Sequence, residues 1–301
     1  MVAGLITGSR VPLQLQQAVS LFALLVLAKY TAHFYLSWGS VIAILAFAVA
    51  LEHICLLAIR KKLDFFSFSS LSTAMGVMLM MTTPQPWIYF MVIGVGLLQK
   101  HVLAFEKRHF FNPSNFALLF GLFFFYDDAH LVLGQLGDAP WLVALVVILA
   151  AAVLVRANRW MISLAFAASY LFLQYLLVVQ HDPVVLFEQI HHRFYSVSFV
   201  VFTLFMLTDP RTTPSSGWQQ LLFGFALALI AACLDRYYGF RVQHLFIALF
   251  VLSPLVPLAA GWRTSKERKK LLLLTSMLLA VVLGVSVSIE RKAPYYFEMH
   301  G

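Results

Sequence analysis

Charged residues are scarce in this chain of 301 residues, since Asp, Glu, Lys and Arg together make up 11% of it. Soluble globular domains carry about 25% charged residues. Hydrophobic residues, by contrast, make up 61% of the chain. This composition excludes a soluble globule and predicts a polytopic membrane protein.

Cysteine is also rare. The chain has two cysteines, Cys55 and Cys233, and both lie within apolar runs. This usage excludes a disulfide framework, and it gives no support to a cysteine-ligated metal site or an iron–sulfur cluster. The stretch 1–17 carries one charge and has no small-residue cleavage site after its apolar run. We therefore expect the first apolar segment to be a membrane helix rather than a signal peptide.

Long polar loops are missing as well, because none exceeds about fifteen residues. A nucleotide-binding domain or a soluble catalytic domain does not fit in such loops. Any oxidation of NADH or ferredoxin must therefore take place on another polypeptide. The net charge of +8 requires no nucleic-acid partner, because basic loops anchor membrane proteins at anionic lipid headgroups.

What the chain has instead is a series of apolar segments separated by polar breaks, which predict membrane helices of an all-α protein. The predicted helices cover 17–36, 40–59, 71–82, 85–105, 113–127, 139–157, 160–180, 194–208, 217–235, 241–260 and 268–289. The third and the eighth are short, and a break that contains proline follows each of them. Such segments are typical of discontinuous helices that end inside the protein, where a neighbour or a ligand satisfies the backbone.

Lys and Arg are distributed unequally between alternate loops. With eleven crossings and a cytoplasmic N-terminus, the cytoplasmic loops hold Arg10, Arg60, Lys61, Lys62, Lys107, Arg108, Arg156, Arg159, Arg211, Arg263, Lys266, Arg268, Lys269 and Lys270. The other side holds Arg193, Arg236, Arg241, Arg291 and Lys292. The positive-inside rule therefore predicts a bacterial cytoplasmic membrane protein with its N-terminus inside and its C-terminus outside.

The two halves of the chain resemble each other at an offset of about 130 residues, where 80–120 is similar to 207–250. Five predicted helices separate corresponding positions, so the halves would have opposite orientations in the membrane. We therefore predict an inverted 5+5 repeat, with a first repeat over 1–127, a second over 128–260, and a basic loop and additional helix over 261–301. Inverted repeats tend to bind their ligand at the interface between the halves.

Polar side chains gather around the start of the predicted helix at Pro113. Lys100 and His101 end one apolar run, and Asn112, Pro113 and Asn115 open the next. Asn112 followed by proline is typical of an N-cap followed by the first helical residue, so the asparagines could serve only as caps. Their place at the mouth of a membrane helix makes them candidate ligand-binding residues as well.

Other polar groups fall at the ends of the short helices. Ser72 and Thr73 open the third helix, and Thr208 and Asp209 follow the eighth. Helix capping and turn formation account for these residues equally well.

Intramembrane charges cost about 2.5–3.5 kcal/mol each on insertion scales, so Glu52, Lys29 and Lys100 need partners, cavities or ligands. An internal Lys–Glu pair is the simplest explanation, and a lysine that reaches the headgroups is another. Haem b is a further alternative, with His53, His101 and His244 as candidate ligands on facing helices.

Taken in order, these motifs resemble one family. The series runs from Ser72 and Thr73 through Thr83-Pro84, 99–101 and Phe111-Asn112-Pro113-Ser114-Asn115 to Leu207-Thr208-Asp209-Pro210 with Thr213-Pro214. It is similar to the flavin-carrying membrane subunits of the Nqr and Rnf redox complexes: the B subunit of the sodium-pumping NADH:quinone oxidoreductase and the D subunit of the Rnf complex. The resemblance implies a fold similar to urea and ammonium channels, a flavin between the halves, and electron transfer across the membrane.

The family attaches FMN to a threonine in a Ser-Gly-Ala-Thr-like motif, and the interval 121–206 contains no such motif. We therefore expect a shortened relative with a noncovalent flavin, riboflavin or FMN, held by the polar residues named above. It would accept electrons from a cytoplasmic flavin or iron–sulfur reductase, or from another redox subunit. Quinone or an extracytoplasmic acceptor would receive them. A transporter or channel for a small solute, with the same fold and no cofactor, is the alternative.

Overall fold

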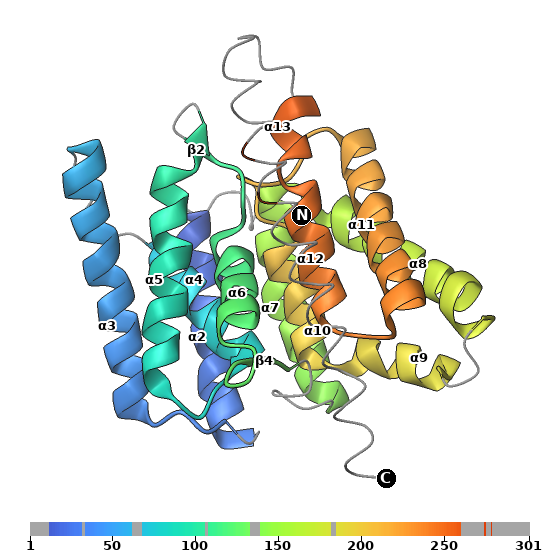
Figure 1. The fold of residues 1–301 in the computed structure, drawn as a ribbon, viewed down its shortest axis with the longest axis horizontal. Helices are drawn as coiled ribbons and strands as arrows, with labels where there is room; N and C mark the ends of the chain where they lie inside the picture. Colours follow the sequence, from blue (N-terminus) through green and yellow to red (C-terminus); the bar gives the residue numbers. More distant parts are fainter. Residues whose placement is uncertain are drawn as a thin grey trace, which may run out of the picture.

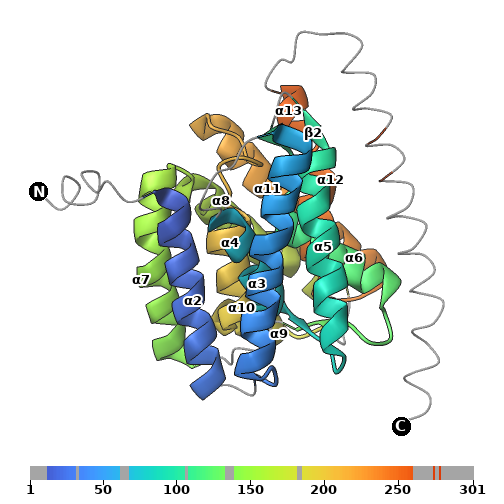
Figure 2. The same ribbon diagram turned by 90° about the vertical axis from the view of Figure 1, so that its left-hand side faces the viewer.

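The computed structural model describes residues 12–31, 34–61, 68–105, 108–132, 139–181 and 185–259, together with Leu274 and Leu278. Nearly all of this part of the chain is helical, as Figures 1 and 2 show. Within it, five helices are long and apolar enough to cross a membrane. The chain is therefore an all-α, multi-pass membrane protein, as its composition predicts.

The first half contains five described helices. They are α2 (Leu13–Thr31), α3 (Trp38–Cys55), α4 (Phe68–Met80), α5 (Pro86–Val102) and α6 (Pro113–Phe124). A π-helical turn, η1 (Leu56–Arg60), extends α3. The antiparallel strands β2 (Ala104–Phe105) and β3 (Arg108–His109) join α5 to α6. Strands β1 (Met81–Thr82) and β4 (His130–Leu131) pair at the opposite end of the molecule (Figure 1). These two ends are called the β2 end and the β4 end.

The second half repeats this order of long and short helices. Its elements are α7 (Pro140–Ala157), α8 (Trp160–Gln174) with η2 (Tyr175–Val179), α9 (Phe187–Tyr195), α10 (Val197–Val201) with η3 (Phe202–Met206), α11 (Gly217–Tyr238), α12 (Gln243–Leu252) and α13 (Leu255–Ala259). In each half, a π-helical turn follows the second long helix.

The helix contacts are those that the predicted inverted repeat would give. In this repeat, helices α2 to α6 correspond in order to α7, α8, α10, α11 and α12. The pair of α3 and α5 then corresponds to the pair of α8 and α11, and the helices of both pairs pack together. Across the interface, α2 packs against α7 and α6 packs against α12, so equivalent helices meet (Figures 1 and 2). This arrangement places the starts of α4 and α6 at the β2 end and the starts of α10 and α12 at the β4 end.

The short helices do not cross the membrane by themselves. At 1.5 Å per residue, the 13 residues of α4 span about 20 Å, whereas the hydrocarbon core is about 30 Å thick. The predicted helix over 241–260 is not continuous, since α12 ends at Leu252 and the chain turns at Ser253 and Pro254 before α13. A proline lacks the backbone N–H that would continue the helix.

Two further differences from the prediction concern helix positions, and one predicted helix is not tested. The first helix covers α2, Leu13–Thr31, rather than 17–36. Helix α9 was not predicted, because it is amphipathic and too polar to look like a membrane segment. The predicted helix over 268–289 lies outside the described residues, apart from Leu274 and Leu278.

Glycines permit the closest helix contacts. A Cβ atom on Gly96 of α5 would lie 2.7 Å from both the Pro113 carbonyl oxygen and the Ala117 Cβ atom of α6. A Cβ atom on Gly224 of α11 would lie 2.7 Å from the Ile162 carbonyl oxygen of α8. Real Cβ contacts are longer than this, so these backbones approach each other only because the side chain is absent. The closeness of α5 and α6 helps to set the position of the Asn112 cap.

Candidate functional site

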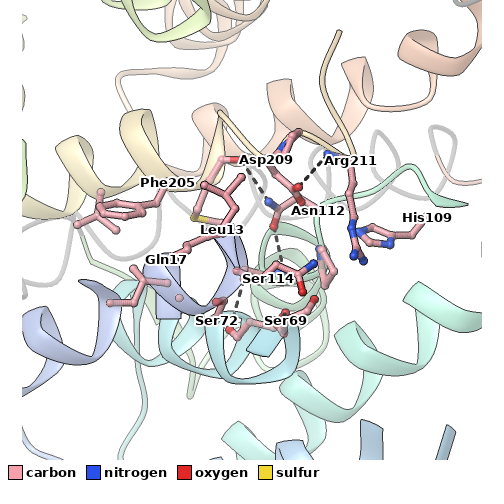
Figure 3. A pocket seen from close by; sticks show the side chains of 18 residues that line it. Leu13, Gln17, Ser69, Ser72, His109, Asn112, Ser114, Phe205, Asp209 and Arg211 are labelled. Atoms are coloured by element: carbon pink, nitrogen blue, oxygen red, sulfur yellow. Dashed lines mark hydrogen bonds between the residues drawn. The ribbon is translucent and has the colours of Figure 1, made fainter. Parts of the chain in front are cut away.

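A small cavity opens at the β2 end, where the first turns of α2, α4 and α6 meet the segment that follows η3 (Figure 3). Its volume is about 70 Å³. Its polar lining comes from Gln14, Gln17, Ser69, Ser72, Thr73, His109, Asn112, Ser114, Asp209 and Arg211. Residues from both halves of the chain therefore share one polar cavity at the interface, as the repeat predicts.

Asn112 caps α6. Its Oδ1 accepts hydrogen bonds from the backbone N–H groups of Ser114 at 3.0 Å and Asn115 at 3.1 Å. Its Nδ2 donates to the Met206 carbonyl oxygen at 3.2 Å. The side chain lies between the Asp209 turn and Ser114 in Figure 3. Asn112 thus fixes α6 to the end of η3, and both ends of its amide are engaged within the protein.

Asn115 lies one turn further along α6, at the contact with α12. Its Nδ2 donates to the Phe246 carbonyl oxygen at 3.0 Å. Its Oδ1 is buried and has no hydrogen-bond partner. Asn115 does not line the cavity, so it joins the two halves at a deeper level than Asn112 does.

The two α4 residues predicted for the site, Ser72 and Thr73, bond to their own helix. Ser72 Oγ donates to the Phe68 carbonyl oxygen at 3.1 Å, and Thr73 Oγ1 donates to the Ser69 carbonyl oxygen at 2.9 Å. Both residues line the cavity. Each hydroxyl oxygen can still accept a hydrogen bond from a bound group.

Lys100 and His101 belong to a buried ionic network. Lys100 Nζ lies 2.6 Å from Glu52 Oε1 and 3.1 Å from Ser69 Oγ. His101 Nε2 lies 3.1 Å from Glu52 Oε2. The lysine and glutamate side chains are each 3% exposed. This network joins α3, α4 and α5, so the internal Lys–Glu pair that the sequence left open is present. Lys29 instead donates to the carbonyl oxygens of Phe34 and Leu36.

Thr208 and Asp209 form the turn after η3. Thr208 Oγ1 donates to the Leu204 carbonyl oxygen at 2.6 Å. Asp209 Oδ1 accepts from the Arg211 backbone N–H at 3.0 Å, as in an Asx turn. Burial raises the pKa of the Asp209 carboxyl above its ordinary value, and the hydrogen bond from Arg211 opposes that shift. Of the two, Asp209 lines the cavity.

Unpaired polar atoms are concentrated beside this region. Both amide atoms of Gln99, His101 Nδ1 and Asn115 Oδ1 are buried without a hydrogen-bond partner. Buried polar atoms are normally bonded, so such a group points to a bound molecule or water. Sequence reasoning missed Gln99 as a candidate. Its place directly before Lys100, inside an apolar helix, was the available signal.

A second buried network lies at the β4 end. Asp235 of α11 accepts hydrogen bonds from Gln174 Nε2 of α8 at 2.6 Å and from the Arg241 backbone N–H at 3.0 Å. His244 Nδ1 lies 2.6 Å from the same carboxylate, and Arg193 Nη1 lies 3.8 Å from it. Gln174 lies 14 residues after Trp160, at the start of α8, and Glu52 lies 14 residues after Trp38, at the start of α3. The two networks therefore occupy equivalent positions in the repeats.

These networks separate the histidines that could have bound haem. His101 contacts Glu52 near the β2 end, where α5 ends, and His244 contacts Asp235 near the β4 end, where α12 begins (Figure 1). His53 Nδ1 bonds the Val49 carbonyl oxygen of its own helix at 2.7 Å. The geometry therefore does not bring His101 and His244 to a matched depth for a common haem.

Phenylalanine rings fill the contact between α6 and α12. The Phe111 and Phe250 rings are stacked with centroids 4.6 Å apart, and the Phe116 ring lies 5.8 Å from the Phe250 ring. Phe246 packs against Phe202 of η3 with centroids 5.1 Å apart. The interface between the halves is closed by aromatic packing at this level.

Five of the predicted site residues therefore meet at the cavity: Ser72, Thr73, Asn112, Pro113 and Asp209. The remaining predicted residues lie around it, in the ionic network, at the contact of α6 with α12, or in the turn after η3. Ordinary small-molecule pockets have volumes of about 300–1,000 Å³, so the cavity of about 70 Å³ is too small for an isoalloxazine ring as it stands. A larger hollow of about 550 Å³ lies at the β4 end and includes Thr83 and Pro84.

Comparison with protein families matches residues 126–269 to the NQR2, RnfD, RnfE family. The matched stretch covers α7 to α13, which includes the Thr208-Asp209 turn and the whole second network. No curated protein matches the chain.

Proposed function

Through residues 126–269 the chain belongs to the NQR2, RnfD, RnfE family, and on this basis we propose that it is an electron-transfer subunit that holds a noncovalent flavin. That the chain is a membrane subunit of the Nqr/Rnf type follows from the family match and the multi-pass fold. The observation that carries the flavin proposal is the group of unpaired buried polar atoms on α5 and α6.

The donor set suits a flavin. Asn115 Oδ1 and the Gln99 amide offer a buried acceptor and donor, which are the groups that fix the polar edge of a ring in a largely apolar site. Serine and threonine hydroxyls line the neighbouring cavity. A bound flavin would supply one-electron and hydride chemistry that protein side chains lack. Lys100 would act on it only together with Glu52, because the two opposite charges lie 2.6 Å apart.

The cavity volume sets a condition on this proposal. The side of the cavity formed by Leu13, Gln14, Gln17 and Leu21 belongs to α2. The other walls come from the starts of α4 and α6, the end of α10, η3 and the turn after it, and Asn112 and the ionic network hold the helices of this region together. We therefore propose that the first turns of α2 move away from α4 when a flavin binds, while the Asn112 cap and the Glu52–Lys100 pair keep their positions.

The partners follow from the distribution of charge. We propose that a flavin or iron–sulfur reductase docks at the β2 end, which carries the basic loops and is expected to face the cytoplasm. Quinone or an extracytoplasmic acceptor would receive the electrons. The described loops are too short to contain a nucleotide-binding domain of their own.

An absorbance spectrum of the purified protein tests the proposal. Flavin bands near about 370 and 450 nm would support it, and they should leave with the small-molecule fraction after denaturation. A fluorescent flavin band that stays with the chain on a denaturing gel would contradict the noncovalent assignment. A Soret band would favour haem, and a colourless protein would favour solute transport.

Two substitutions then locate the flavin. Asn115→Leu should reduce the flavin content, because it removes the unpaired Oδ1. Asn112→Ser should retain more flavin, because serine caps a helix about as well as asparagine. Full flavin content in the Asn115 variant would move the site away from α6.

A further inference from the structure

Arg159 is a buried cation at the β2 end, in the turn between α7 and α8, and it is 8% exposed. Its Nη1 donates to the carbonyl oxygens of Ala157 at 3.3 Å and Asn158 at 3.1 Å. Its Nε donates to Thr213 Oγ1 at 3.3 Å, and its Nη2 approaches the Pro210 carbonyl oxygen at 3.5 Å. All four partners are neutral, and all four contacts are long for a guanidinium group.

No carboxylate forms an ion pair with Arg159 in the part of the chain that the structure describes. Asp209 is close enough to act on it electrostatically but belongs to no ion pair with it. Buried charges in proteins are normally paired, because removing a lone charge from water is costly. The carbonyl groups at the end of α7 compensate only part of a full positive charge. Arg159 therefore needs an anion.

A cavity of about 180 Å³ lies directly beside Arg159. Arg211, which is exposed, also lines it, together with Thr212, Thr213 and Ser215. Thr212 is 1% exposed, and its Oγ1 has no hydrogen-bond partner. Helix α11 begins at the same cavity, and its N-cap residue Ser216 makes no side-chain cap hydrogen bond.

We propose that this cavity binds the phosphate group of a phosphomonoester or phosphodiester. Two guanidinium groups, a buried hydroxyl without a partner and an uncapped helix N-terminus are the groups that recognise such an anion. The volume accommodates a phosphate group together with ordered water, since one water occupies about 30 Å³. This cavity adjoins the proposed flavin cavity, with which it shares His109, Pro210 and Arg211, but the proposal rests on Arg159 and Thr212 and does not depend on a bound flavin.

The phosphate has two possible sources. Trp160 follows Arg159 directly and is 47% exposed, and Trp218 at the start of α11 is 68% exposed. Exposed tryptophans at helix ends mark the level of the lipid headgroups. A phospholipid headgroup could therefore reach the cavity from the bilayer, and a soluble phosphorylated ligand could reach it from the aqueous side.

The test uses inorganic phosphate as the probe and the full-length protein, delipidated in a nonionic detergent. Thermal unfolding is followed by tryptophan fluorescence across a phosphate titration, with sodium chloride at matched ionic strength. Ligands that bind only the native state raise the unfolding temperature in a saturable way. Thr212→Val and Arg211→Gln should each weaken the apparent phosphate affinity by about tenfold.

The matched control is Ser198→Ala. Like Thr212, Ser198 is buried and its hydroxyl has no partner, but it lies at the start of α10, at the other end of the molecule. Without phosphate, Thr212→Val should be as stable as the wild type or more stable, because the lost hydroxyl bonds nothing in the protein. Ser198→Ala should bind phosphate as the wild type does.

An experiment with lipid distinguishes a phospholipid headgroup from a soluble phosphorylated ligand. In nanodiscs of phosphatidylglycerol, the effect of added phosphate should disappear if headgroups fill the cavity, and it should persist if the natural ligand is soluble. Lipid phosphorus retained in detergent is measured for the wild type and for Thr212→Val. The proposal is overturned if phosphate stabilises all variants equally. It is also overturned if the wild type neither responds to phosphate nor retains more lipid phosphorus than Thr212→Val.

Discussion

The pair of Glu52 and Lys100 offers the sharpest test of the fold around the candidate site. Lys100→Met removes one partner of an ion pair whose side chains are each 3% exposed and whose atoms lie 2.6 Å apart. Loss of one partner of a buried pair typically costs about 3–5 kcal/mol, because the other charge stays buried and uncompensated. His101 remains on Glu52 at 3.1 Å, so we expect the lower part of that range.

The double variant Glu52→Gln/Lys100→Met should recover most of the lost stability. It leaves no buried unpaired charge, and replacement of a whole buried pair is often neutral or stabilising. The glutamine keeps an oxygen as a partner for His101. We therefore expect the two single substitutions to be strongly non-additive, with a coupling free energy of about 2–3 kcal/mol.

Thermal unfolding in detergent provides the assay. One kcal/mol shifts the unfolding temperature by about 2–4 °C in proteins of 150–250 residues, so Lys100→Met should lower it by roughly 6–12 °C on that scale. Lys29→Met is the control, because Lys29 donates to the backbone carbonyl oxygens of Phe34 and Leu36. A double variant that loses the sum of the single effects would refute the ion-pair argument.

Three further predictions concern packing, protonation and orientation. Gly224→Ala should destabilise the protein by about 1–3 kcal/mol, because the new Cβ atom would lie 2.7 Å from the backbone of α8. Gly39→Ala should be tolerated, since the atom nearest to its Cβ would be 3.7 Å away, and equal unfolding temperatures for the two variants would contradict this argument. Asp209→Asn should raise the stability near neutral pH, because burial raises the pKa of the Asp209 carboxyl and the native wild type therefore loses stability as the pH rises above about 3.8. In unfolding curves, the gain of the variant over the wild type should vanish below that pH. Single cysteines at Asp127 and Lys61, in a chain without its native cysteines, should react with an impermeant reagent from opposite sides of the membrane, and reaction of both from one side would refute the inverted repeat.

The sequence was most informative where the bilayer limits the options. A hydrocarbon core of fixed thickness requires apolar segments of fixed length, so most of the helix positions could be predicted from the breaks between apolar runs. The cap at Asn112 could also be predicted, because capping depends only on residues within one turn. Helix α9 was not predicted because it is short, amphipathic and polar, so no apolar run marks it.

Contacts between distant residues could not be predicted in the same way. The bond from Asn115 to the Phe246 carbonyl oxygen joins positions 131 residues apart, and it depends on how α6 meets α12. The break in α12 was missed for a related reason. Pro254 lies within an apolar run, and a proline in such a run either kinks a membrane helix or ends it, depending on the neighbours that satisfy the freed backbone groups.

The two halves place their buried polar networks at equivalent positions but build them from different residues. Glu52 and Gln174 lie at the same level of equivalent helices, yet the acid of the first network is on α3 and that of the second, Asp235, is on α11. In both halves, a hydrogen bond of 2.6 Å ties the second long helix to the fourth helix of the repeat. Because the halves are inverted, one network lies near the β2 end and the other near the β4 end. Each network therefore holds together its own half of the bundle. Between them, Asn115 and the phenylalanine rings make the contact of α6 with α12, so a molecule could enter between the halves at that level only by displacing the rings.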